Sequence, residues 1–222
     1  MRLDADGTQQ VIMASSGDLP TDLITNGFSL TPRGSFLIAN VGASEGVFEL
    51  HIDGSMRVFL TEIDGQVLLS TNFVNYDRQG RVWISISTIA QDRDRSFKKD
   101  VADGYVILVD ERGARIAVDE IGFTNENKVH PSGEWLYVHE TMGRALIRFP
   151  IRADNSLGPR ETVAEYGVGI FPDGFEFDSE GGIWCTSVVS NRVVRVDANG
   201  DQHTVLDAGD PELIEQAESA YQ

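Results

Sequence analysis

Four polar residues recur at one fixed place in this chain of 222 residues, and their side chains could hold a metal ion. Each is followed eight residues later by a glycine: Asn26 by Gly34, Asn72 by Gly80, Asn125 by Gly133, and Asp173 by Gly181. Amide and carboxylate oxygens are hard ligands, which suit Ca²⁺, Mg²⁺ or Mn²⁺ better than they suit soft metals. A cation held there could polarise an ester carbonyl or lower the pKa of a bound water, with Asp173 as general base.

A structural explanation competes with the chemical one. Asn and Asp are common in turns because their side chains hydrogen-bond the neighbouring backbone. A turn is the favoured explanation of any one of these positions taken alone, and for Asn26 it stays favoured. Recurrence does not separate the two explanations, since a structural turn would recur too. The change from Asn to Asp at position 173 favours a need for negative charge in the last copy.

The recurring residues belong to a repeated unit. Each is followed by an extended stretch, a turn closed by the glycine, and a run rich in β-branched and aromatic residues. The repeat glycines are 46, 53 and 48 residues apart, and a second set of turns ends at glycines 7, 54, 113, 158 and 200. Two hairpins per unit predict four antiparallel strands per unit, which is typical of a β-propeller blade. A β-sandwich is the alternative, and the constant offset of eight residues argues against it.

We therefore predict one all-β domain over residues 1–222, built as a β-propeller of four-stranded antiparallel blades. The predicted parts are outer strands of a first blade (1–20), four blades (26–70, 72–120, 125–168 and 173–208) and an acidic tail (209–222), whose residues 211–220 are the main helix candidate. A propeller closes by joining its first and last blades. Four blades and an outer hairpin do not close in the usual way, so we favour a piece of a longer propeller.

The predicted fold gathers the recurring residues. In a blade the innermost strand starts at one face, beside the central channel, so the side-chain oxygens of all four recurring residues, Asn26, Asn72, Asn125 and Asp173, should converge around the channel mouth. The insertion 91–100 falls in a loop that reaches the same face, where it forms either a lid or a solvated charged run.

Composition excludes several functions. The chain has 18 basic and 35 acidic residues, a formal net charge of −17, so we expect no nucleic-acid partner. The lone cysteine, Cys185, excludes a thiolate metal cluster, and we expect it to be a small buried hydrophobe. His139 and Glu140 begin like an HExxH zinc motif, but position 143 is Gly and the segment is a strand, so we exclude a zinc-protease site there. Without a long apolar run or a signal sequence, we expect no membrane partner and a cytoplasmic protein.

Several segments resemble one known family. Residues 122–141 resemble the NG-hydrophobic-SPDG-LYVAD-S blade of the SMP-30/gluconolactonase/LRE family. Residues 171–187 and 191–197 resemble that family's next blade more closely, with the Pro-Asp-Gly at 172–174 as the most diagnostic part, and residues 71–84 resemble the preceding blade. The likeness runs from Met1 to about Val205. Members are six-bladed propellers that hydrolyse sugar lactones and similar cyclic esters with one divalent cation.

The resemblance implies roles for individual residues. Asp173 would be a metal ligand and the general base, Asn125 a metal ligand, and Asn72 a contact of the substrate or of a metal-bound water. The cation would be Ca²⁺, or else Mg²⁺, Mn²⁺ or Zn²⁺, and the substrate a small lactone or ester. The alternative is a non-catalytic propeller that binds a partner or serves as a scaffold. We also expect self-association through open blade edges.

Departures from the family pattern weaken the expected site. The family's glutamate ligand would precede Met1, a sixth blade is absent, and Ser70 and Asn72-Phe-Val stand where some members have substrate-binding residues. One carboxylate and two amides remain as expected metal ligands. The number of charged ligands changes the affinity of a site for Ca²⁺ over several orders of magnitude, so the loss of carboxylates weakens the expected binding.

We therefore predict weak metal binding, and little or no lactonase turnover, from these 222 residues alone. Titration calorimetry of the chain with Ca²⁺ checks this, and a dissociation constant in the low micromolar range would contradict it.

Overall fold

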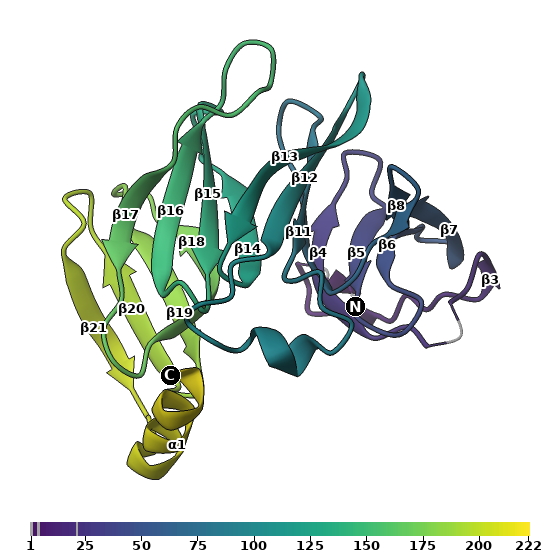
Figure 1. Ribbon diagram of the computed structural model, residues 1–222. Helices are drawn as coiled ribbons and strands as arrows, with labels where there is room; N and C mark the ends of the chain where they lie inside the picture. The colour runs from purple at the N-terminus through teal and green to yellow at the C-terminus, as the bar shows by residue number, and fades with distance from the viewer. Residues whose placement is uncertain (1, 4, 21) are drawn as a thin grey trace.

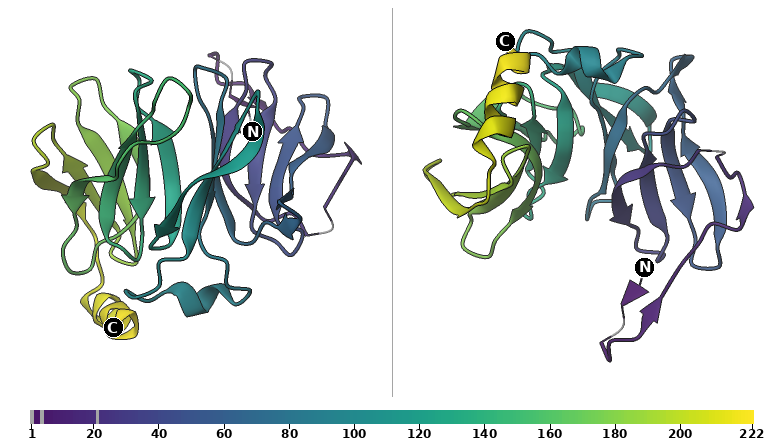
Figure 2. Two further views of the ribbon diagram at one scale, coloured as in Figure 1. Left: turned by 45° about the horizontal axis from the view of Figure 1, so that its top comes forward. Right: turned by 90° about the horizontal axis from the view of Figure 1, so that it is seen from below.

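Four antiparallel sheets stand side by side and form an arc (Figures 1 and 2). They belong to a computed structural model that describes residues 2–3, 5–20 and 22–222. Each sheet takes four strands from one continuous stretch of chain, in sequence order, so the predicted blades are confirmed. No helix in the described part of the chain is long and apolar enough to cross a membrane.

We call the sheets blades 1 to 4, each with its inner strand first. Blade 1 contains β4 (Thr25–Leu30), β5 (Phe36–Asn40), β6 (Gly46–Leu50) and β7 (Ser55–Leu60). Blade 2 contains β10 (Thr71–Tyr76), β11 (Val82–Ile86), β12 (Gly104–Asp110) and β13 (Gly113–Ile121). Blade 3 contains β14 (Thr124–Val129), β15 (Trp135–Glu140), β16 (Ala145–Pro150) and β17 (Glu161–Glu165). Blade 4 contains β18 (Phe171–Phe177), β19 (Ile183–Val188), β20 (Arg192–Val196) and β21 (Gln202–Asp207).

Five short strands lie outside this pattern. Near the N-terminus, β1 (Arg2–Leu3) pairs with β2 (Gln9–Gln10), and β3 (Ser16–Gly17) pairs in parallel with β7 at the outer edge of blade 1. A small hairpin of β8 (Glu62–Ile63) and β9 (Gln66–Val67) connects blades 1 and 2. The assignment of residues 1–20 to a preceding blade stays a prediction, and residues 1 and 4 of that stretch lie outside the described part.

The repeat glycines close the turn between the first and second strands of each blade. Gly34, Gly80, Gly133 and Gly181 have φ angles between 80° and 83°. A side chain with a Cβ atom is strained in this left-handed region, whereas glycine adopts it readily. The fixed spacing in the sequence therefore reflects one backbone requirement, repeated in four blades.

The blades hold together through apolar side chains between neighbouring sheets. Trp83 is fully buried between blades 2 and 3, with Leu136 and Val138 from the facing sheet. Trp135 packs at the edge of the cluster between blades 3 and 4. Trp184, at the place in blade 4 that Trp83 has in blade 2, is 38% exposed because no described sheet covers that side of blade 4. Trp83 and Trp135 therefore contribute to the packing between blades, whereas Trp184 does not.

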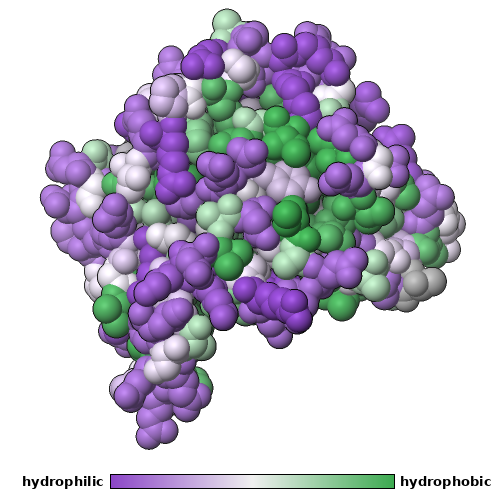
Figure 3. All heavy atoms as spheres, viewed as in Figure 1, coloured by the Kyte–Doolittle hydropathy of each residue, from purple (hydrophilic) through white to green (hydrophobic). Residues whose placement is uncertain are grey.

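The other end of the arc is also uncovered. Hydrophobic side chains gather over β4–β6 on the face turned to the viewer in Figure 3. They line a hollow of about 920 Å³, whose walls include Phe28, Leu30 and Ile52. Asn26 lies at this hollow and is exposed.

Two helical segments lie below the sheets in Figure 1. The 3₁₀ helix η1 (Arg93–Ser96) interrupts the loop between β11 and β12, and α1 (Pro211–Tyr221) follows blade 4. Asp210 caps α1, because its side chain accepts hydrogen bonds from the N–H groups of residues 212 and 213, and a proline opens the first turn. Tyr221 packs on an apolar cluster contributed by blades 3 and 4 and their connections. The helix predicted in the acidic tail is confirmed.

Candidate functional site

All four recurring polar residues lie in β-bulges of inner strands. The register against the second strand shifts between residues 25 and 28, 71 and 73, 124 and 127, and 172 and 175. Each interval contains one recurring residue: Asn26, Asn72, Asn125 or Asp173. These residues are therefore inside strands, and the turn interpretation, favoured for Asn26, is wrong. A bulge interrupts the ladder and re-aims side chains, and bulges are over-represented next to active sites.

Two of these residues share one hydrogen-bonding pattern. The side-chain amide of Asn72 donates to the hydroxyl of Ser87 at 3.0 Å, and that of Asn125 donates to the hydroxyl of Thr141 at 2.9 Å. Both asparagines are buried. Because the amide nitrogen of each is used within its own blade, the Oδ1 atom is the group left to face another ligand.

The same hydroxyls connect each blade to the next. Ser87 donates to the carbonyl of Thr124 on β14 at 3.0 Å, and Thr141 donates to the carbonyl of Pro172 on β18 at 2.7 Å. β14 contacts both β10 and β18. The bulges of three consecutive inner strands are thus at the same end of neighbouring strands and are linked by side-chain bonds.

Asp173 differs from the asparagines. Its side chain is half-buried, and among the described residues its carboxylate accepts no hydrogen bond. Its backbone carbonyl accepts one from Nδ1 of His139 at 2.8 Å. The carboxylate is therefore available to a ligand, while the backbone that carries it is held in place.

Sequence reasoning missed two charged side chains at this end of the strands. Glu45 precedes β6, and its half-buried side chain has a buried Oε2 atom without a hydrogen-bond partner. Burial raises the pKa of Glu45 to about 7, although a backbone hydrogen bond from Thr71 and the charge of Arg93 oppose the shift. The sequence holds no repeat or motif that would have singled it out.

Arg93 is the second of these residues. It lies on η1, and its guanidinium is 5.1 Å from the ring centre of Phe123, two residues before Asn125. Its Nε atom is buried without a hydrogen-bond partner. Burial lowers the pKa of Arg93, and the negative charges of Glu45, Asp94 and Asp173 partly offset this effect. The signal in the sequence that could have indicated Arg93 is its position in the insertion at 91–100.

The insertion covers the end of the strands where the bulges lie. Phe97 stacks on Phe123, with ring centres 5.0 Å apart. The backbone N–H of Lys99 donates to the carbonyl of Tyr221 at 3.2 Å, so the loop meets α1. Figure 2 shows the two segments on the same side of the blades. The loop therefore lies where a lid would lie.

The donor set fits a hard cation held by oxygen. Asn125 and Asp173 offer one amide and one carboxylate oxygen from adjacent strands, and Asn72 offers another amide oxygen. The hydroxyls of Thr71 and Thr124, each one residue before an asparagine, are buried without a partner. No group of three His, Cys, Asp or Glu side chains suited to a metal exists among the described residues. Such a set suits Ca²⁺ or Mg²⁺ and carries little negative charge.

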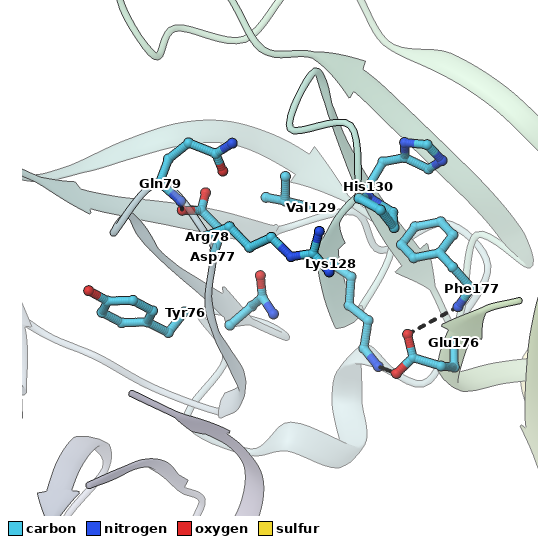
Figure 4. A pocket seen from close by; sticks show the side chains of 11 residues that line it. Tyr76, Asp77, Arg78, Gln79, Lys128, Val129, His130, Glu176 and Phe177 are labelled. Carbon is cyan, nitrogen blue, oxygen red and sulfur yellow. Dashed lines mark hydrogen bonds and ion pairs between the residues drawn. The ribbon is translucent and has the colours of Figure 1, made fainter. Parts of the chain in front are cut away.

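A second hollow, of about 260 Å³, lies at the opposite end of the inner strands (Figure 4). Arg78 extends across it, and Lys128 bonds Glu176 at 2.6 Å. Lys128 also pairs with Glu126 at 3.1 Å. The charged side chains that line this hollow largely neutralise one another, and none of the four recurring polar residues lines it.

The fold is that of a β-propeller, with a bulge in each inner strand. The chain belongs to the SMP-30/gluconolactonase/LRE-like family, whose model matches residues 1–212.

Individual relatives are consistent with this membership. A 6-deoxy-6-sulfogluconolactonase from Pseudomonas putida is 30% identical over 177 residues, which are 78% of this chain and 57% of that protein. A gluconolactonase structure from Xanthomonas campestris matches with a TM-score of 0.68 at 22% identity, covering 82% of this chain and 62% of that one. The calcium-binding protein regucalcin from Agrobacterium tumefaciens matches at 0.56 and 20% identity, covering 86% and 75%. The chain thus spans less than two thirds of the first two relatives.

Glu45 should make stability depend on pH. Its ordinary pKa is 4.5 and its folded value is about 7, so the unfolded chain loses this proton before the folded chain does. The free energy of unfolding should therefore fall as pH rises from about 4.5 to about 7. Glu45→Gln should lack this fall and should gain stability relative to wild type as the pH approaches about 8.

Urea unfolding over this pH range measures the effect. The control is Glu134→Gln, which changes an exposed glutamate on the β14–β15 turn. Equal pH slopes for wild type and Glu45→Gln would contradict the prediction.

Proposed function

We propose that the protein to which this chain belongs is a hydrolase of lactones or related esters that depends on one divalent cation. The observation that carries the proposal is the equivalent placement of Asn72, Asn125 and Asp173 in bulges at one end of three adjacent inner strands. Membership of the gluconolactonase family and the sulfogluconolactonase relative support this choice.

The residues would divide the work as follows. Asn125 and Asp173 hold the cation, which when bound polarises the ester carbonyl and makes water easier to deprotonate. Asp173 accepts the proton of the attacking water, because its carboxylate has no competing hydrogen bond from the described residues. Asn72 orients the substrate through the Oδ1 atom that its bond to Ser87 leaves free.

Calcium is the cation that we favour. The ligands are oxygens from amide and carboxylate groups, and Ca²⁺ accepts such neutral oxygens in flexible geometry. The name of the regucalcin neighbour describes that protein as calcium-binding. With one carboxylate among the ligands, we expect an affinity at the weak end of the range for calcium sites.

The second candidate is a non-catalytic propeller that binds a partner. The uncovered apolar hollow on blade 1 and the net charge of −17 favour it. Self-association through open blade edges and a cytoplasmic location also stay predictions. The two candidates differ in whether a divalent cation and the Asp173 carboxylate matter for hydrolysis.

The first experiment asks whether hydrolysis needs Asp173 and a cation. The whole protein to which this chain belongs is assayed on a panel of γ- and δ-lactones with Ca²⁺, with excess EDTA, and as the Asp173→Ala variant. EDTA should abolish hydrolysis, and the substitution should lower kcat/KM by about 10²- to 10⁴-fold because it removes the base. Asp119→Ala, an exposed carboxylate on β13, is the control and should leave the rate unchanged. A rate of hydrolysis that neither EDTA nor Asp173→Ala changes would contradict the proposal.

Arg93 suggests what kind of lactone is hydrolysed. In the described part of the chain its half-buried guanidinium makes no hydrogen bond or ion pair, although it faces the end of the strands that carries Asp173. A guanidinium bonds planar or tetrahedral oxyanions through two parallel N–H groups. The name of the Pseudomonas putida relative specifies a lactone with a sulfo group. We therefore propose a sugar lactone that carries an anionic group away from the ring ester.

Arg93→Gln should separate charged from neutral substrates. With a sulfo-substituted lactone, kcat/KM should fall by about 10- to 100-fold, the worth of one hydrogen bond between charged groups. The unsubstituted lactone should be hydrolysed as by wild type. Arg95→Gln, on the same 3₁₀ helix but 81% exposed, is the matched control. Equal losses on both lactones would show that Arg93 does not recognise the anionic group.

A further inference from the structure

The bulge of β18 leaves backbone N–H and C=O groups that do not pair with β19. Side chains form hydrogen bonds with these groups instead. The carbonyls of residues 172 and 173 accept from Thr141 and His139, at 2.7 and 2.8 Å. The N–H of Phe175 donates to Glu126 at 2.6 Å, and the N–H of Gly174 donates to the Thr186 hydroxyl at 3.2 Å. Three of these four side chains belong to blade 3. The backbone that carries Asp173 is therefore held mainly by the neighbouring blade.

His139 is the central member of this arrangement. Its side chain is fully buried, and its ring packs on Phe175 with centres 4.7 Å apart. The two ring nitrogens face a carbonyl and a hydroxyl and no carboxylate, so the buried ring is neutral, because a buried charge without a partner is costly. The Asp173 carbonyl can only accept a hydrogen bond, so the proton of the neutral ring must be on Nδ1. The Nε2 atom then has a lone pair and needs a donor.

Tyr166 provides this donor. Its hydroxyl is 3.1 Å from Nε2 of His139 and 2.9 Å from the Cys185 sulfur, either of which can accept its one proton. If the hydroxyl donates to sulfur, Nε2 is left buried without a donor, which is unfavourable. If it donates to Nε2, that nitrogen is satisfied, and the Cys185 thiol still has the carbonyl of Ile183 as an acceptor at 3.9 Å.

We infer that His139 is a positioning residue for Asp173, with its tautomer fixed by a one-way chain of hydrogen bonds. The chain runs from the Tyr166 hydroxyl to Nε2 of His139, and from Nδ1–H to the Asp173 carbonyl. The Ala of the family's LYVAD-S pattern has no side-chain donor, whereas this sequence has His139 at that place. The functional part of the inference rests on the role proposed above for Asp173.

The tautomer has its own measurement. The chain has four histidines, and long-range ¹H–¹⁵N correlations identify which ring nitrogen of each is protonated. His139→Asn, which removes one ring signal, assigns His139. We expect the neutral Nδ1–H form for His139 near pH 7. An Nε2–H form, or a charged ring, would overturn the inference.

The positioning role is tested by a matched pair of variants. His139→Leu removes the donor to Asp173, whereas His139→Asn keeps an N–H near the position of Nδ1. His139→Leu should lower calcium affinity and kcat by about 10- to 100-fold, as expected when a group that orients a ligand is lost. KM should change little, and His139→Asn should stay within about threefold of wild type, since it restores the donor. His203→Leu, on exposed β21, is the control.

The outcomes separate this inference from the proposed function. If the whole protein to which the chain belongs hydrolyses no lactone, the proposed function fails, while calcium affinity and the ¹H–¹⁵N correlations still decide the inference. If His139→Leu does not fold, Tyr166→Phe replaces it, and calcium binding weakened by that variant supports the chain. Wild-type affinity in both His139→Leu and Tyr166→Phe would overturn the positioning role.

Discussion

One constraint shapes the candidate site: an inner strand that bulges at the channel end must find partners for the backbone groups that its own sheet no longer pairs. An unpaired buried N–H or C=O group is costly, so side chains from the same and the preceding blade supply those partners. Ser87 and Thr141 do so for two successive blades, and His139 does so for Asp173. The polar residues available to a ligand and the contacts between blades are therefore consequences of the same irregularity.

The sequence predicts the fold well because the repeat is a backbone requirement. A glycine with positive φ in each blade, and a polar residue eight positions before it, give the number of strands and their order. The predicted helix was also found, since Asp210 and Pro211 form a clear start signal. The turn interpretation failed because Asn and Asp suit turns and bulges alike, and composition cannot tell whether a strand continues beyond them.

The candidate site is only partly visible in the sequence. Asn72, Asn125 and Asp173 were singled out by their spacing, and the structure places them on neighbouring strands, while their roles stay proposals. Glu45 and Arg93 come from loops between second and third strands, whose lengths differ from blade to blade, so no spacing indicates them. His139 was set aside in the sequence because Gly143 breaks the HExxH zinc motif that His139 begins. Its contact with Tyr166, and the contact of Tyr166 with Cys185, join residues 27 and 19 positions apart, which only the packing of blades 3 and 4 creates.

The hydroxyl bonds between blades also give the arc a polarity. Ser87 and Thr141 each donate forward, from one blade to the next along the chain. In blade 4 the hydroxyl of Ser187 instead donates to the carbonyl of Val188 in its own blade. Adjacent blades are therefore not interchangeable modules. A blade duplicated or moved during evolution would keep its hydrogen bonds to the neighbouring blades only if the donating hydroxyl and the bulge that accepts its bond were inherited together.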